Sequence, residues 1–223
     1  MGPLEIVLVN RWGLSDIGAC ALYSDFMDYV VHMTRRPVDL PVYRWENFPL
    51  RVHAQSYELP GTGVDLGPEA LKAVTAWDDA LGGGGNHLVS TADPAQADIL
   101  IEFGSPGSYG RTSLLVPAED IGTAVPQQVR CGITSDPVNY GNELDPDYPN
   151  ELVASVVAMH ELGHALGLLD HACSGSLMAD AISLALIDQL PEDRWDEAVA
   201  LSERRAVRVL RALPQGLALE GYE

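Results

Sequence analysis

The feature that most constrains this chain is an apolar helix with three ionisable residues near its end. The segment from about Glu151 to Leu166 follows Asn150, a favourable N-cap residue, and precedes Gly167, which favours a helix end. Nearly all of its other side chains are apolar, so the helix is expected to be buried. Burying ionisable groups without partners is costly. The three residues, His160, Glu161 and His164, are therefore expected to act together.

The spacing of these residues suits a metal ion and a base beside it. Histidines four residues apart lie on one face of a helix, so His160 and His164 can bind the same metal. Glu161 is rotated by about 100° from His160, which places it beside the metal rather than on it. There it can take a proton from water and deliver it to a leaving amine. A buried histidine pair satisfied by hydrogen bonds alone is the alternative.

A catalytic zinc needs a third protein ligand and an open position for water. Gly167 lies three residues after His164 and permits a sharp turn. Asp170 lies three residues after Gly167, and this spacing favours it as the third ligand. His171 is the commoner ligand type and is the alternative if one leucine of the run is an insertion.

The string from His160 to Asp170 resembles the extended pattern of the metzincin zinc proteases. Aspartate at its last position, where most metzincins have histidine, is similar to the snapalysin family of small secreted bacterial metalloproteases. In that family the aspartate is the third zinc ligand. Ser176-Leu177-Met178 resembles the metzincin Met-turn, which implies that Met178 lies beneath the metal site.

The order of the expected elements favours an α+β fold. Strands are expected at about 4–9, 50–56, 97–103, 114–117 and 127–134, and helices at about 15–33, 68–81, 151–166 and 192–213. The resemblance implies a metzincin-like twisted, mostly parallel sheet with an active-site helix and a C-terminal helix. It also implies that 97–103 is the central strand and that 114–117 is an edge strand that holds an extended peptide. Residues 1–48 are expected to form an N-terminal extension, either a packed lobe or a pro-segment, before a catalytic domain at 49–223.

Charge and hydropathy exclude several classes of partner. The formal net charge is −19, with a single lysine, Lys72, which argues against nucleic acid and anionic membrane surfaces. No run of apolar residues is long enough for a membrane span. The first residues lack the basic region and cleavage site of a secretory signal. A monomer that acts on peptide or protein substrates is expected, and the resemblance to secreted proteases favours an extracellular location.

Two further features of the sequence are candidate binding sites. An acidic loop from Asp136 to Asn150 has oxygen ligands that suit Ca²⁺, but its spacing matches no EF-hand and a solvated loop is the alternative. Its oxygen-bearing side chains are Asp136, Asn139, Asn142, Glu143, Asp145 and Asp147. Arg130-Cys131-Gly132 resembles the cysteine switch of matrixin propeptides. It lies inside the catalytic region, so a buried cysteine, or one bonded to Cys173, is the preferred interpretation.

The sequence thus predicts a zinc metalloendopeptidase with His160, His164 and Asp170 as ligands and Glu161 as general base. One alternative is a gluzincin-type peptidase, whose third ligand would be a glutamate on the last helix. The candidates are Glu192, Glu197 and Glu203. The other alternative is a zinc-stabilised binding protein without turnover, which would have no use for a carboxylate at position 161.

Overall fold

The computed structural model of the chain describes residues 4–7, 45–104, 110–116, 128–134, 150–168, 177–178, 187 and 189–212, and within these residues six strands and three α-helices have defined bounds. The strands are β1 (Leu4–Val7), β2 (Leu50–Ala54), β3 (Leu88–Ser90), β4 (Ile99–Gly104), β5 (Gly110–Val116) and β6 (Gln128–Thr134). The α-helices are α2 (Leu66–Leu81), α3 (Asn150–Ala165) and α5 (Leu201–Ala212). Two short 3-10 helices, η3 (Pro94–Gln96) and η6 (Glu192–Ala198), complete the described elements.

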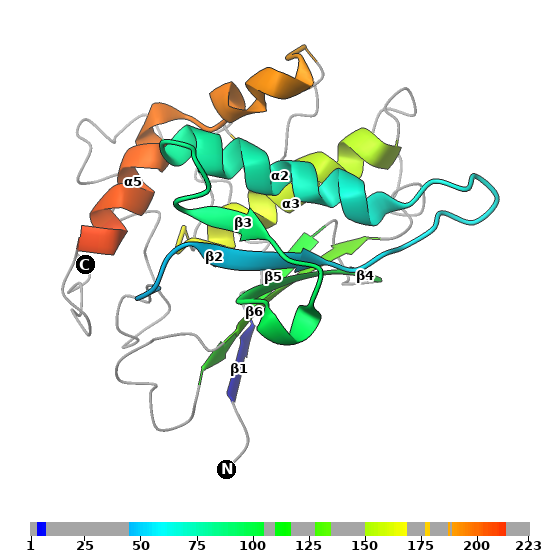
Figure 1. Cartoon of the computed structure of the whole chain (residues 1–223), viewed down its shortest axis with the longest axis horizontal. Coiled ribbons are helices and arrows are strands. Elements are labelled where there is room, and N and C mark those ends of the chain that lie inside the picture. Colours follow the sequence, from blue (N-terminus) through cyan, green and yellow to red (C-terminus); the bar gives the residue numbers. More distant parts are fainter. Residues whose placement is uncertain are drawn as a thin grey trace, which may run out of the picture.

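The strands form one sheet in the order β1-β5-β6-β4-β2-β3, with α2 and α3 stacked on one of its faces (Figure 1). β3, β2, β4 and β6 are parallel neighbours, whereas β5 is antiparallel to both β6 and β1. This mixed architecture is compatible with the predicted α+β class, and the sheet is mostly parallel as expected. The predicted strand at 97–103 is β4, and it lies inside the sheet between β6 and β2.

The prediction that the segment near 114–117 forms a sheet edge is wrong. That segment belongs to β5, which pairs with β6 on one side and with β1 on the other. The register with β1 runs from Leu4 opposite Val116 to Val7 opposite Ser113. The predicted N-terminal strand therefore supplies the outer hydrogen-bonding partner of β5. The predicted boundary at residue 48 places β1 outside the catalytic domain, so it does not anticipate this pairing.

Helix α2 is present as the sequence predicts, but it begins at Leu66, two residues before the expected start. The Asp65 carboxylate caps its start by accepting a hydrogen bond from the Gly67 N–H at 2.9 Å. Its apolar side chains are buried against α3, and the indole N–H of Trp77 donates to the carbonyl of Met159 at 2.7 Å. Gly82 has φ of 135°, and it ends the helix as predicted. The hydrogen bond from Trp77 fixes α2 against the centre of α3.

The glycine run at 82–85 is an ordered connection into β3, a strand that the sequence did not predict. The buried carboxylate of Asp78 accepts hydrogen bonds from the backbone N–H groups of Gly85, His87 and Leu88 at 2.7, 2.9 and 3.1 Å. Burial is the largest single influence and raises the pKa of Asp78, but the three hydrogen bonds and the nearby His87 together outweigh it and leave the pKa lowered. One carboxylate thus directs the chain from the end of α2 into the sheet.

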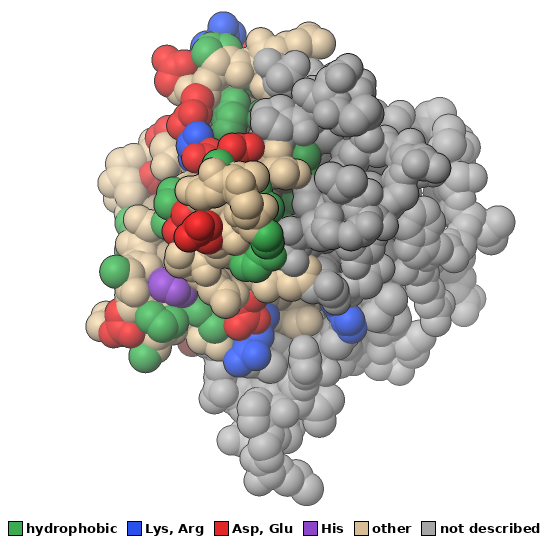
Figure 2. Space-filling view, turned by 90° about the vertical axis from the view of Figure 1, so that its right-hand side faces the viewer, with side chains coloured by type: hydrophobic (Ala, Val, Ile, Leu, Met, Phe, Trp, Pro, Cys, Tyr) green, Lys and Arg blue, Asp and Glu red, His purple; other side chains and the backbone are tan. Residues whose placement is uncertain are grey.

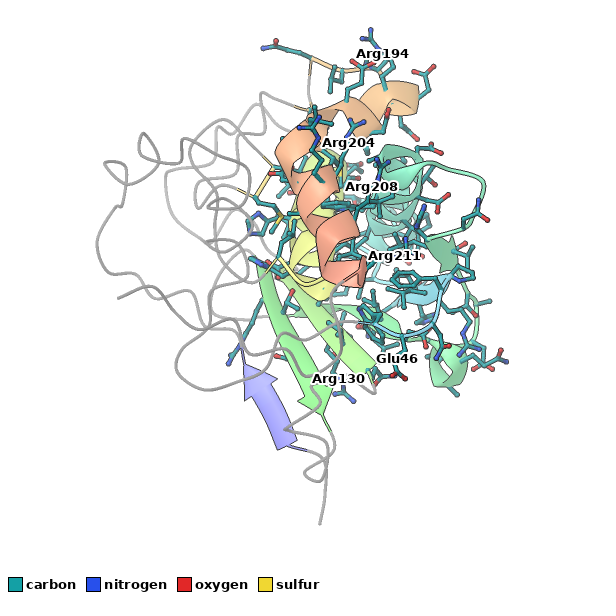
Figure 3. All side chains as sticks on the ribbon, turned by 90° about the vertical axis from the view of Figure 1, so that its left-hand side faces the viewer. Glu46, Arg130, Arg194, Arg204, Arg208 and Arg211 are labelled. Carbon is teal, nitrogen blue, oxygen red and sulfur yellow. The ribbon has the colours of Figure 1, made fainter. Side chains whose placement is uncertain are left out.

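The expected single helix at 192–213 is instead two helices, η6 and α5, with Val199 and Ala200 between them. The Arg204 guanidinium donates to the carbonyls of Val199 and Asp196, which stabilises the break. Figure 3 shows Arg204, Arg208 and Arg211 following one another along α5. Arg208 donates to the carbonyl of Leu81 at the end of α2. These side-chain bonds to backbone carbonyls, which helix periodicity does not reveal, hold α5 in place.

Little of the predicted extension at 1–48 falls within the described residues. β1 joins the sheet, and Trp45 is buried in the core, where its indole N–H donates to the carbonyl of Ala165 at 2.8 Å. Trp45 thus satisfies a carbonyl at the end of α3. The helix expected at 15–33 lies outside the described residues, and the boundary at residue 48 stays a prediction.

Surface charge on the described residues is mixed. On the face in Figure 2, acidic and neutral side chains are interspersed, and the Lys and Arg side chains there form no continuous patch. None of the helices in the described part of the chain is long and apolar enough to cross a membrane.

Candidate metal centre

Helix α3 carries the three predicted ionisable residues in a buried environment. Every residue from Val153 to Ala165 is buried, because α3 packs against α2 and against strands β5 and β6 of the sheet. The helix ends as predicted: Gly167 has φ of 108°, and the Leu168 N–H donates to the Gly163 carbonyl at 3.1 Å. This turn directs the chain toward residues 169–176, which include Asp170 and His171 and lie outside the described residues.

The two imidazole rings of α3 face each other through their Nε2 atoms. The Nε2 atoms of His160 and His164 are 3.1 Å apart, and the ring planes are nearly perpendicular, at 86°. Nδ1 of His160 lies 2.8 Å from the carbonyl oxygen of Leu177, and Nδ1 of His164 lies 2.5 Å from that of Leu168. A carbonyl can only accept, so each Nδ1 carries the proton and each Nε2 of a neutral ring presents a lone pair.

This arrangement fits a shared zinc ion. Two nitrogens bound to one tetrahedral zinc at 2.0–2.1 Å lie about 3.3 Å apart, close to the observed 3.1 Å. Two facing lone pairs repel unless a cation or proton lies between them. Hydrogen bonds from the far ring nitrogen to carbonyls are also the usual support of zinc-binding histidines. Within the described residues no group of three or more His, Cys, Asp or Glu side chains could hold a metal, and the predicted third ligand, Asp170, lies outside them.

The turn at Leu177 and Met178 packs directly beneath the histidines. The Leu177 carbonyl fixes His160, and Met178 lies against Gly163, which sits between the two histidines in sequence. A Cβ at Gly163 would overlap Sδ of Met178 and would lie 3.0 Å from its Cε. Residue 163 therefore has to be a glycine for Met178 to occupy this position. That Met178 lies beneath a metal stays a prediction, and the structure places its side chain against Gly163 of α3.

The three glutamates of the gluzincin alternative have other partners. Glu192 pairs with Lys72 at 2.9 Å, and Glu197 pairs with Arg194 at 2.7 Å. The Glu203 carboxylate is fully buried and accepts hydrogen bonds from the backbone N–H groups of Met178 and Ala200, at 3.2 and 2.8 Å. Glu203 thus joins the start of α5 to the turn beneath the histidines.

The Glu161 side chain points to β5 rather than into solvent. It is 4% exposed, and its Oε2 makes a short hydrogen bond with Oγ1 of Thr112. Burial raises the pKa of Glu161 to about 8, although the hydrogen bond from Thr112 acts in the opposite direction. The carboxyl group of the metal-free protein is therefore mostly protonated at neutral pH. A nearby cation would favour its charged form.

Cys131 is a buried free thiol, so the predicted alternative of a bond to Cys173 does not hold. Its Sγ lies 3.7 Å from the carbonyl oxygen of Glu161 and 3.7 Å from Oγ1 of Thr112. Burial raises the pKa of the Cys131 thiol far above its usual range. A neutral thiol is a poor zinc ligand, which argues against a cysteine switch at this position.

Comparison with known proteins adds no family assignment. No model of a known protein family matches the sequence, and no curated protein is significantly similar to it.

Several residues that shape the site were not predicted from the sequence. The carbonyls of Leu168 and Leu177 are backbone atoms, so no residue type marks them. Thr112 contacts Glu161 from 49 positions away and has no motif around it. Glu203 was considered only as a metal ligand. The oxygen-bearing side chains considered for Ca²⁺ lie outside the described residues.

Proposed function

We propose that this protein is a zinc-dependent endopeptidase of the metzincin type. The observation that carries the proposal is the histidine pair, whose Nε2 atoms lie 3.1 Å apart while both Nδ1 atoms contact backbone carbonyls. Met178 packed against Gly163 and the positive φ of Gly167 add support, since Gly167 belongs to the extended motif and Met178 to the segment that resembles the Met-turn.

His160 and His164 would hold the zinc ion, with Asp170 as the third ligand and His171 as its alternative. When bound, zinc would polarise the scissile carbonyl and make water a stronger nucleophile. Glu161 would accept the proton of the attacking water and pass it to the leaving amine. The buried position of Glu161 suits this role, because a raised pKa brings the group closer to neutral pH.

The gluzincin alternative is less well supported, because Glu192, Glu197 and Glu203 each have ion-pair or backbone partners. A zinc-stabilised binding protein would need the histidines but not Glu161. Burying that carboxyl group costs free energy that a purely structural site has no reason to spend. We therefore favour turnover over binding alone, with a peptide substrate, a monomeric enzyme and an extracellular location as parts of the same proposal.

The test combines metal analysis with cleavage of casein, an unstructured protein. The wild type is expected to bind about one zinc per chain and to cleave casein. Glu161→Ala is expected to abolish cleavage while zinc content stays nearly unchanged. The matched control is Glu151→Ala, which removes a glutamate from the first turn of the same helix.

Three outcomes separate the hypotheses. A wild type that binds no zinc would refute the proposal. Zinc binding without cleavage would establish the binding-protein alternative. Loss of zinc in Glu161→Ala would show that Glu161 is itself a ligand.

A further inference from the structure

Thr112 of β5 contacts both the side-chain carboxyl group and the backbone carbonyl of Glu161. Its side chain is 1% exposed, and its Oγ1 makes a short hydrogen bond with Oε2 of Glu161. The same Oγ1 lies 3.2 Å from the backbone carbonyl oxygen of Glu161. Within the described part of the chain, Thr112 is the hydrogen-bonding partner of the Glu161 carboxyl group.

Gly110 restricts the same carboxyl group from the other side. Gly110 and Thr112 are two residues apart on β5, so they face the same side of the sheet. A Cβ at Gly110 would overlap Oε1 of Glu161 and would lie 2.7 Å from its Cδ and 2.8 Å from its Cγ. Only a glycine leaves room for Glu161 in this orientation. Two residues of β5 thus determine where each carboxyl oxygen lies.

Cys131 of β6 supports Thr112 from the neighbouring strand. Its Sγ lies 3.7 Å from Oγ1 of Thr112 and 3.7 Å from the carbonyl oxygen of Glu161. The threonine side chain is also β-branched, which limits its rotation about χ1. The hydroxyl is therefore held at a defined position between β6 and α3.

We propose that Thr112 is a positioning residue for the reaction, one that orients the Glu161 carboxyl group through its hydroxyl while Gly110 leaves the space this orientation needs. The inference rests on the proposed function, because it assigns a role relative to the base of that reaction. A hydroxyl can both donate and accept, so Thr112 can contact Glu161 as a carboxylate and as a carboxylic acid. It can hold the side chain before and after proton transfer.

The test compares three variants of the zinc-loaded full chain. Thr112→Val keeps the shape and removes the hydroxyl, whereas Thr112→Ser keeps the hydroxyl. The matched control is Ser155→Ala, which removes another buried hydroxyl of the same region, one that contacts the carbonyls of Glu69 and Glu151. Thr112→Val is expected to lower kcat for casein cleavage about 100-fold, because small displacements of a reacting group cost about that much. Its KM and its zinc affinity should not change, and Thr112→Ser and Ser155→Ala should keep near wild-type kcat.

A second readout does not depend on activity. In the metal-free protein, the infrared band of the Glu161 carboxyl group is obtained as the difference between the wild type and Glu161→Gln. Loss of the hydrogen bond in Thr112→Val should shift this band, and Thr112→Ser should leave it in place. If Thr112→Val does not fold, Gly110→Ala replaces it, since it displaces Glu161 without removing the hydroxyl and should also lower kcat.

The outcomes are distinct from those that test the proposed function. A wild type that cleaves casein, together with a Thr112→Val variant of unchanged kcat and unchanged infrared band, would overturn the positioning role. A rise in KM or a loss of zinc with unchanged kcat would also overturn it, because the residue would then serve binding instead. A wild type without any cleavage would remove the proposed function and this role with it.

Discussion

Replacing Gly163 by alanine should destabilise the protein through its contact with Met178. The added Cβ would overlap Sδ of Met178 and would lie 3.1 Å from Cζ2 of Trp77, and both of those side chains are fully buried. Adding a carbon to a filled core costs about 1–3 kcal/mol. Alanine is favoured over glycine inside a helix by about 1 kcal/mol. The net loss in the free energy of unfolding is therefore about 0–2 kcal/mol.

The same substitution should have the opposite sign once Met178 is removed. Met178→Ala alone should cost about 2–5 kcal/mol, because it leaves a cavity beneath α3. In that background the new Cβ of residue 163 enters the cavity, so Gly163→Ala should be neutral or stabilising by up to about 1 kcal/mol. The coupling between the two positions is thus expected to be about 1–3 kcal/mol.

Urea unfolding of the four proteins of this cycle, in the presence of a chelator, measures the coupling. A chelator competition assay on the same proteins measures zinc affinity, which Gly163→Ala should lower. The reason is that a displaced Met178 moves the Leu177 carbonyl, which fixes His160. Equal effects of Gly163→Ala in both backgrounds would refute the contact between the helix and the turn.

Three further predictions concern the ligands, the base and the N-terminal strand. Asp170→Ala should weaken zinc binding sharply and His171→Ala only mildly in a chelator competition assay; the reverse ranking would favour His171 as the ligand. In the metal-free protein, folding raises the pKa of Glu161 to about 8, from about 4.3 in the unfolded chain. The free energy of unfolding should therefore fall as pH rises between these values, by up to about 1.4 kcal/mol per unit, and urea titrations of Glu161→Gln should lack this slope. Deleting residues 1–7 removes β1 and exposes the outer side of β5; a rise in casein cleavage would identify a pro-segment, and an unchanged or lower rate a packed lobe.

The elements that the sequence predicted best are those with a strong local signal. α3 has an apolar sequence with a glycine after its end, and both the helix and its end at Gly167 are confirmed. The strand at 97–103 was recognisable from its apolar run between polar residues, and it is β4. β3 was missed because it has three residues and follows four glycines. Its position depends on the carboxylate of Asp78, a contact that periodicity does not show.

The errors in the fold come from hydrogen bonds that the periodicity of a segment does not show. β1 and β5 are separated by about a hundred residues, so the local pattern of either strand gives no sign of the other. The break between η6 and α5 depends on Arg204, whose guanidinium bonds backbone carbonyls of the preceding turn. An arginine at position 204 is by itself compatible with an uninterrupted helix. In the first case a distant strand decided the outcome, and in the second a side chain that bonds the nearby backbone.

In the candidate site, the residue types are recognisable from the sequence, but the atoms that orient their side chains are not. Histidine and glutamate at helical spacing are recognisable because few other functions need them together. The orientation of each side chain instead comes from a different part of the chain: Leu177 for His160, Leu168 for His164 and Thr112 for Glu161. Two of these three partners are backbone carbonyls, which every residue has.

The hydrogen bonds that orient the two histidines would also prepare the site for a metal. Both imidazoles are fixed with the proton on Nδ1, so their Nε2 atoms can accept a cation without rotating or losing a proton. The hydrogen bonds to the two carbonyls, which form on folding and do not involve a metal, thus offset the entropic cost of ordering these rings. Glu161 is different, because burial raises the pKa of its carboxyl group to about 8 and the residue directly follows His160 in sequence. A cation bound at His160 and His164 would favour the carboxylate, so binding of the metal and preparation of the base would occur together.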